Sequence, residues 1–266
     1  MLTTITEQRL VVVSDVHLGN ALFHARRPFV EFLRHVRKAG YALCINGDGV
    51  DIVQTTLRQI TRDLSDCTSE LRKFKQEGLP VYYTVGNHDI VLEHFLDDWE
   101  IVRLAPFLNL SSGDKRIRIE HGHLYDESFV NHPRIYVLTT LMGGAALRIH
   151  PRAYKLLESG RPLLEGVGHL FGRLAGRKPP EPAPGETIPN EPMGFRERAL
   201  EISRHGFDAV IFGHTHHEGA VTLGSGATYV NTGSWLFEPH FAEVDHGRVV
   251  LRRVADWLGE AKVEGK

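Results

Sequence analysis

The stretch LVVVSDVHLGN, residues 10–20, decides the fold, because an apolar β-branched run ends abruptly at Asp15 and His17. β-Branched residues favour strands, and a short run that is apolar at every position is typical of a strand buried on both faces. In α/β sheets, ligands bind at the carboxyl ends of such strands. The stretch therefore predicts a buried strand that brings a carboxylate and an imidazole to one edge of a sheet.

The same arrangement recurs along the chain. Apolar or mostly apolar runs at residues 42–45, 81–85 and 209–212, and the alternating segment at residues 117–120, are predicted as strands, and a polar motif containing glycine follows each of them. One such motif occurs by chance in many proteins, but five in order, each after a strand, predict a shared site. The five motifs are Asp15-Val16-His17, Gly47-Asp48-Gly49-Val50-Asp51, Gly86-Asn87-His88-Asp89, His121-Gly122-His123 and Gly213-His214-Thr215-His216.

Helical patterns separate the first three predicted strands. Residues 28–38 place apolar side chains at helical spacing, and residues 57–74 form a longer polar-faced pattern that stops at Gly78-Leu79-Pro80. Alternation of strand and helix predicts an α/β layered fold. The tail has short strand patterns separated by turns, which predict a second, mostly antiparallel sheet; these are residues 220–223, 228–230 and 249–254.

A different composition interrupts this pattern. We expect a core of residues 1–125 and 207–266, and a helical insertion lobe at residues 126–206 with a proline-rich segment at 178–192. An apolar helical face within the lobe packs against its own helices in one interpretation, and covers a substrate as a lid in the other. The two interpretations are compatible.

The five motifs offer only oxygen and nitrogen ligands, which suit divalent cations rather than thiolate-loving metals. Two cations held side by side need a bridging carboxylate, for which Asp48 is the natural choice, and they supply an activated water and neutralise phosphoryl charge. We expect Mn²⁺, with Fe, Zn²⁺ and Mg²⁺ as alternatives. The predicted terminal ligands are Asp15, His17 and His216 for one ion, and Asn87, His121 and His214 for the other.

A leaving oxygen needs a proton, and His88 is the predicted general acid, since it adjoins Asn87 without being needed as a ligand. Asp51 is predicted to hold the His88 ring and to favour its protonated form. The alternative interpretation of Asp51 is an N-cap of the helix that follows.

The five motifs resemble those of the calcineurin-like metallophosphoesterase superfamily, from Asp15 to His216. This resemblance implies a four-layer α/β/β/α sandwich with a dinuclear metal centre. It also implies that His121, rather than His123, is the ligand in the fourth motif. The following residues 231–235 resemble a loop of the superfamily, which we interpret as a turn beside the site with Trp235 forming one wall.

The substrate follows less directly from the sequence. Phosphoprotein phosphatases of the superfamily carry Asp-Arg-Gly where this chain has Asp51-Ile52-Val53, which argues against a protein substrate. The insertion is similar to the lid lobe of bacterial UDP-2,3-diacylglucosamine diphosphatases of lipid A synthesis. The best-known branch has Asn-Arg-Asp in place of Asn87-His88-Asp89. The alternatives are a phosphodiesterase acting on a small soluble substrate such as a cyclic nucleotide, and a non-catalytic metal-binding scaffold.

Composition limits the partners. Lysine and arginine total 31 against 33 acidic residues, so no basic footprint for nucleic acid is expected. Two cysteines and an N-terminus without a signal pattern predict a cytoplasmic protein. The resemblance to the superfamily implies a small phosphoester or a nucleotide-linked lipid as its partner. The basic cluster Arg173, Arg177 and Lys178 is interpreted as a solvated face, with peripheral contact to the inner membrane as the alternative.

Overall fold

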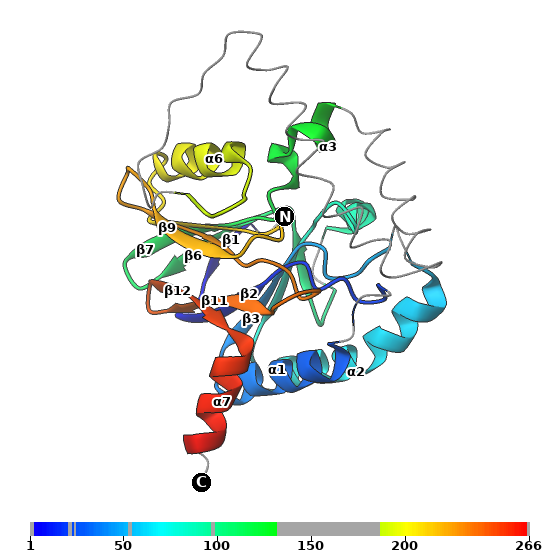
Figure 1. Cartoon of the computed structure of the whole chain (residues 1–266). Helices are drawn as coiled ribbons and strands as arrows, with labels where there is room; N and C mark the ends of the chain where they lie inside the picture. The colour runs from blue at the N-terminus through cyan, green and yellow to red at the C-terminus, as the bar shows by residue number, and fades with distance from the viewer. Residues whose placement is uncertain are drawn as a thin grey trace.

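The computed structural model describes residues 3–20, 23, 25–52, 55–96, 99–131 and 187–264. Two six-stranded sheets pack face to face, with helices on both outer sides (Figure 1). The first sheet has the strand order β12 (Arg248–Arg253), β11 (His240–Asp245), β2 (Arg9–Val13), β3 (Ala42–Asn46), β4 (Val81–Thr84) and β5 (Arg103–Ala105). The second has the order β1 (Thr4–Thr6), β6 (Leu108–Ser112), β7 (Lys115–Ile119), β8 (Ala209–Phe212), β10 (Thr228–Asn231) and β9 (Gly219–Thr222).

The helices complete four layers, as predicted. The first sheet is covered by α1 (Arg26–Lys38), α2 (Leu57–Gln76) and α7 (Val254–Glu264), and the second by α6 (Met193–Ser203) (Figure 1). Three short segments complete the described elements: the 3₁₀ helices η1 (Ile90–Phe95) and η2 (His123–Tyr125), and α3 (Glu127–Asn131). The fold class expected from the sequence is confirmed.

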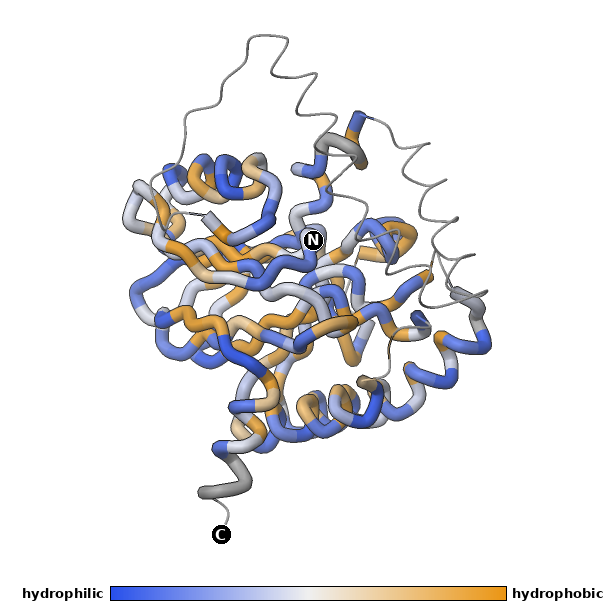
Figure 2. Tube along the Cα trace, viewed as in Figure 1, coloured by the Kyte–Doolittle hydropathy of each residue, from blue (hydrophilic) through white to orange (hydrophobic). Residues whose placement is uncertain are grey.

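Strand β2 shows why these runs are apolar at every position. Leu10 and Val12 face the second sheet, whereas Val11 and Val13 face the helices, and all four are buried. Full burial of a Val or Leu side chain is worth about 1.5–3 kcal/mol, so both faces of the strand stabilise the sandwich. Figure 2 shows the apolar residues along the strands of both sheets.

The prediction of a second, mostly antiparallel sheet for the tail holds only in part: β9 and β10 pair antiparallel in the second sheet, but that sheet is mixed and β12 lies in the first. Strand β10 is parallel to β8 and antiparallel to β9 in the second sheet, while β11 and β12 extend the first sheet beside β2. Phe241 of β11 packs towards the helices, and Ala242 and Val244 pack between the sheets. Hydrophobic alternation gives the burial of each strand but not its distant neighbour, so the sheet assignment could not be deduced from it.

Most of the predicted insertion, including its apolar helical face and basic cluster, lies at residues 132–186, outside the described part of the chain. The described remainder includes α6, whose Phe195 and Ala199 pack with Val210 and Phe212 of β8. Residues predicted to belong to the lobe therefore form the outer layer of the second sheet. Among the described helices, none combines the length and apolarity required to cross a membrane.

Candidate metal centre

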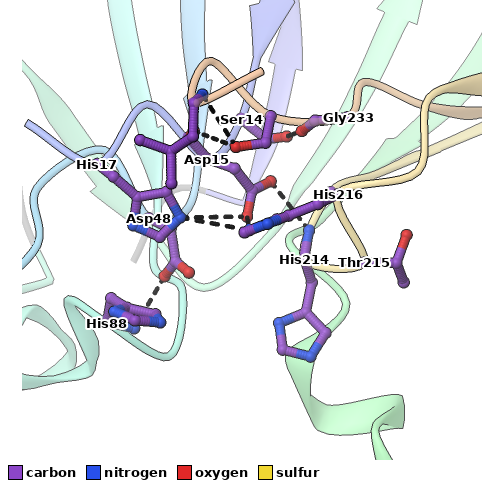
Figure 3. A network of polar contacts seen from close by, with 12 residues as sticks. Ser14, Asp15, His17, Asp48, His88, His214, Thr215, His216 and Gly233 are labelled. Carbon is purple, nitrogen blue, oxygen red and sulfur yellow. Dashed lines mark hydrogen bonds and ion pairs between the residues drawn. The ribbon is translucent and has the colours of Figure 1, made fainter. Parts of the chain in front are cut away.

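The structure brings all the predicted site residues together. Figure 3 shows six of them: Asp15, His17, Asp48, His88, His214 and His216. The loops after β2, β3 and β4 come from the first sheet, and those after β7 and β8 come from the second. Parallel strands in each sheet point these loops in one direction. The site is therefore assembled from five segments that are distant in the sequence.

The first group contains Asp15, His17 and His216. A carboxylate oxygen of Asp15 lies 3.2 Å from Nε2 of His216, and that nitrogen lies 3.3 Å from Nε2 of His17. One ligand atom from each residue falls within 4.8 Å of the others. Two imidazole nitrogens and a carboxylate oxygen converging in this way match the donor set of one divalent cation.

The second group contains Asp48, Asn87, His121 and His214. Nδ1 of His121 donates to the backbone oxygen of Asn46, which leaves Nε2 at 3.4 Å from the Asp48 carboxylate and 3.2 Å from the Asn87 side-chain oxygen. Nδ1 of His214 lies 2.8 Å from the same Asn87 oxygen. Asp48 also shares a ligand cluster with Asp15, so its carboxylate lies between the two groups.

The electrostatics of these groups fit positive ions. Burial alone would raise the pKa of Asp15, but His121 and His216 lower it to about 2. Burial alone would lower the pKa of His121, but Asp48 and Asp15 raise it to about 10. Nδ1 of His17 is buried and has no hydrogen-bond partner among the described residues, and buried Oδ1 of Asp15 faces only the imidazole nitrogens of His216 and His17 there, without a hydrogen bond of regular geometry. Negative charge and unsatisfied ligand atoms together indicate a site shaped for cations.

The backbone is strained where the ligand atoms converge. Five of the seven predicted ligands have positive φ angles, between 51° and 70°. Such conformations cost on the order of 1–3 kcal/mol each for residues other than glycine, and they gather at functional sites. The fold therefore maintains an arrangement that these residues would not adopt in isolation. They are Asp15, His17, Asp48, His214 and His216.

Two motif glycines allow close approach rather than a sharp turn. A Cβ on Gly86 would lie 2.1 Å from an Asp48 carboxylate oxygen, and one on Gly213 would lie 2.6 Å from an Asp15 carboxylate oxygen. Neither glycine has a positive φ angle. At these two positions, predicted ligands take the space that a side chain would need.

His88 and Asp51 form a pair beside the first group. Nδ1 of His88 lies 3.2 Å from an Asp51 carboxylate oxygen, and Asn20 donates to the other oxygen at 2.6 Å. The alternative interpretation of Asp51 as an N-cap is wrong, because Thr56 caps α2 through a capping box. A ring nitrogen of His88 also lies within 4.8 Å of ligand atoms of His17 and Asp48.

Residues 231–235 hold the first group against the carboxyl end of β2. Oγ of Ser14 lies 2.6 Å from Oγ1 of Thr232, and the backbone nitrogen of Trp235 donates to the backbone oxygen of Asp15 at 3.1 Å. The loop is a turn beside the site, as predicted. The prediction for Trp235 is wrong, because its ring packs on Phe29 and Phe32 of α1 in the core.

Sequence reasoning missed several supporting groups. Asp89 accepts hydrogen bonds from the backbone nitrogens of Gly49 at 3.0 Å and Gly86 at 2.7 Å, which join the second and third motifs. Its place in the third motif was an available signal. Asp126, which contacts His214, had no such signal. His123 is buried with neither ring nitrogen paired among the described residues, and His121 is the histidine that faces Asp48.

Known proteins resemble this chain in sequence and in structure. The model of the family described as calcineurin-like phosphoesterase matches residues 8–218. A UDP-2,3-diacylglucosamine hydrolase of Stenotrophomonas maltophilia is 23% identical over 250 residues, covering 88% of this chain and 94% of that protein. A dimetal phosphatase from Danio rerio has a TM-score of 0.50 at 16% identity, covering 92% of this chain and 95% of that one. A hypothetical protein from Pyrococcus horikoshii has a TM-score of 0.45 at 12% identity, covering 97% and 94%.

Proposed function

The chain belongs to the calcineurin-like phosphoesterase family, and on that premise we propose that it cleaves the diphosphate of a nucleotide-linked lipid. It is a metal-dependent phosphoester hydrolase. The observation that carries the chemistry is the convergence of seven oxygen and nitrogen ligand residues beside the His88–Asp51 pair. Addition of water across the P–O–P bond of such a substrate gives two monophosphates.

Two observations support this class of substrate. The relative from Stenotrophomonas maltophilia is named as a hydrolase of UDP-2,3-diacylglucosamine and aligns over 88% of this chain. Exposed apolar side chains also border the site in sequence or in space. Ile52 follows Asp51, Ile90 and Val91 follow Asp89, and the ring of Phe237 lies 6.2 Å from that of His216. A charged centre with an apolar border suits a substrate that has both a diphosphate and a hydrocarbon part.

Each site residue has a role in this proposal. Asp15, His17 and His216 hold one divalent ion, Asn87, His121 and His214 hold the other, and Asp48 lies between them. When bound, the two ions supply an activated water and neutralise charge on the phosphoryl oxygens. Because Nδ1 of His88 faces Asp51, its Nε2 is the atom that gives a proton to the leaving oxygen.

The His88–Asp51 pair predicts a shift in the pH dependence of the rate. Burial opposes protonation of His88, but the charges of Asp48 and Asp51 raise its pKa above the usual value. A general acid acts while protonated, so the rate falls as the pH rises through this pKa. Bound cations oppose the effect of Asp48, which leaves Asp51 as the supporting charge. Asp51→Asn is therefore expected to move the alkaline limb of kcat to lower pH.

The measurement is kcat between pH 5 and 10 at saturating substrate and Mn²⁺. Both the wild type and the variant should contain the same amount of metal, since Asp51 is not a predicted ligand. The matched control is Asp63→Asn, which removes another buried carboxylate from α2, away from the predicted ligands. An alkaline limb that stays in place in Asp51→Asn would contradict the assigned pairing.

A substrate comparison tests the proposed function itself. With added Mn²⁺, we expect UDP-diacylglucosamine to be cleaved to UMP at a kcat/KM at least about 100-fold above that for bis-p-nitrophenyl phosphate or cyclic AMP, a discrimination of about 2.7 kcal/mol. Parallel reactions with Mg²⁺, Zn²⁺ and Fe²⁺ test the expectation of manganese. Cleavage of the soluble diesters without cleavage of the lipid would favour the soluble-substrate alternative. The absence of hydrolysis of any phosphate compound would favour the scaffold.

A further inference from the structure

The loop that carries His214 and His216 contacts two carboxylates to which the proposed chemistry gives no role. Asp126 follows η2, and Glu191 precedes α6. The carboxylate of Asp126 lies 3.0 Å from Nε2 of His214, whereas Glu191 reaches Thr215 and Asn231. The two carboxylates contact different parts of one loop, so their effects on it can be separated.

Asp126 acts on the imidazole ring. Nε2 of His214 carries a hydrogen when it donates to Asp126, and this tautomer leaves the lone pair on Nδ1, 2.8 Å from the Asn87 oxygen. The ring also stacks on Phe195 of α6, with 5.8 Å between ring centroids and 25° between planes. Asp126 and Phe195 therefore set the position, tautomer and basicity of the His214 ring from the side away from Asn87.

Glu191 contacts the same loop through the side chain of Thr215, and through Asn231, which bonds to the loop backbone. One carboxylate oxygen accepts from Tyr229 at 2.7 Å, from Asn231 at 2.8 Å and from Thr215 at 3.3 Å. The Asn231 amide also donates to the backbone oxygen of Gly213 at 2.9 Å. These bonds fix the path of the loop without touching either predicted histidine ligand.

We propose that Asp126 is a positioning residue for the second metal ion, because it sets the tautomer and orientation in which His214 presents Nδ1. A carboxylate that accepts from the outer nitrogen of a metal-bound histidine raises its basicity, and loss of such a partner typically costs 10–100-fold in metal affinity. The inference rests on the proposed role of His214 as a ligand. It does not depend on the identity of the substrate.

The test measures Mn²⁺ binding by calorimetry or equilibrium dialysis. In Asp126→Ala, one of the two ions is expected to bind about 10–100-fold more weakly, whereas the other keeps its wild-type affinity. Asp126→Asn retains an acceptor without the charge, so its affinity for this ion should lie between those of the wild type and Asp126→Ala. Asp126→Glu should restore part of the affinity. The metal-free unfolding temperature should not change, since Asp126 is partly exposed.

Glu191→Gln is the matched control. It also changes a carboxylate to an amide beside this loop, but it keeps the oxygen that accepts from Tyr229 and Asn231. We expect it to bind both ions as the wild type does. Equal weakening in Asp126→Ala and Glu191→Gln would indicate a general loosening of the loop and would overturn the proposal, as would wild-type affinity in Asp126→Ala.

Binding and turnover separate the two proposals. A wild-type protein that binds two ions but does not cleave the lipid diphosphate would overturn the proposed substrate and leave the role of Asp126 to be decided by affinity. A wild-type protein that binds fewer than two ions would overturn the role of Asp126, because that role requires His214 to be a ligand of a second ion.

Discussion

Asp48→Asn is expected to abolish binding of the two metal ions and to lower kcat/KM at least about 10³-fold. This loss exceeds the about 10–100-fold typical for removal of a residue that hydrogen-bonds to a metal ligand. The buried Asp48 carboxylate lies 3.4 Å from His121 and shares ligand clusters with Asp15 and His17. Removal of its charge therefore affects both groups. Asparagine tolerates the φ angle of 51° at this position and keeps an acceptor for the backbone nitrogen of His88. The substitution should leave the fold in place.

Metal analysis and thermal unfolding with and without Mn²⁺ check this result together. Mn²⁺ at a free concentration 100 times its dissociation constant stabilises the folded protein by about 2.7 kcal/mol, and the variant should lose that stabilisation. Asp114→Asn, at an exposed turn with 87% of its side chain accessible, is the control and should behave as the wild type. If Asp48→Asn retained two ions and full activity, the bridging role would be wrong.

His88→Ala is expected to keep both ions and to lower kcat about 10²–10⁴-fold on a diphosphate or other ester with a poor leaving group. A good leaving group such as p-nitrophenolate departs without a proton, so hydrolysis of its esters should fall far less. The dependence on leaving group separates loss of an acid from general damage to the site. The comparison needs only kcat on the two substrates and the metal content of each preparation.

A histidine outside the site provides the control for this variant. His205 lies just beyond α6 and is exposed, and His205→Ala should match the wild type on both substrates. Equal losses on good and poor leaving groups would show that His88 does not act as the acid. Because a His88 ring nitrogen lies within 4.8 Å of ligand atoms of His17 and Asp48, loss of metal in His88→Ala would instead assign it to the metal centre.

Local patterns in the sequence were sufficient to predict the motif-bearing strands. The run before Asp15 is apolar at every position because its strand is covered on both faces, and the strands before Asp48 and Asn87 are likewise buried along their whole length. A motif directly after such a strand must lie at its carboxyl end. The candidate site could therefore be assembled from the order of strands and motifs alone.

The remaining features depend on contacts between distant segments. Nothing near Asp126 in the sequence indicates that His214, 88 positions later, will donate to it. Trp235 follows the site loop in sequence, yet its ring packs against α1 in the core. The tail strands were also assigned to one sheet although β12 lies in the other, because alternation within a strand does not specify which distant strand lies beside it.

The attachment of residues 231–235 to the carboxyl end of β2 has a consequence for biosynthesis. His17 and His216 are separated by 199 positions, and β2 acquires its neighbour β11 only when residues 240–245 are present. At about 5–20 residues per second, a ribosome needs roughly 10–40 s to span that separation. We therefore expect a nascent chain to expose the first ligands well before it can retain a cation, so that metal loading waits until synthesis has passed residues 240–245.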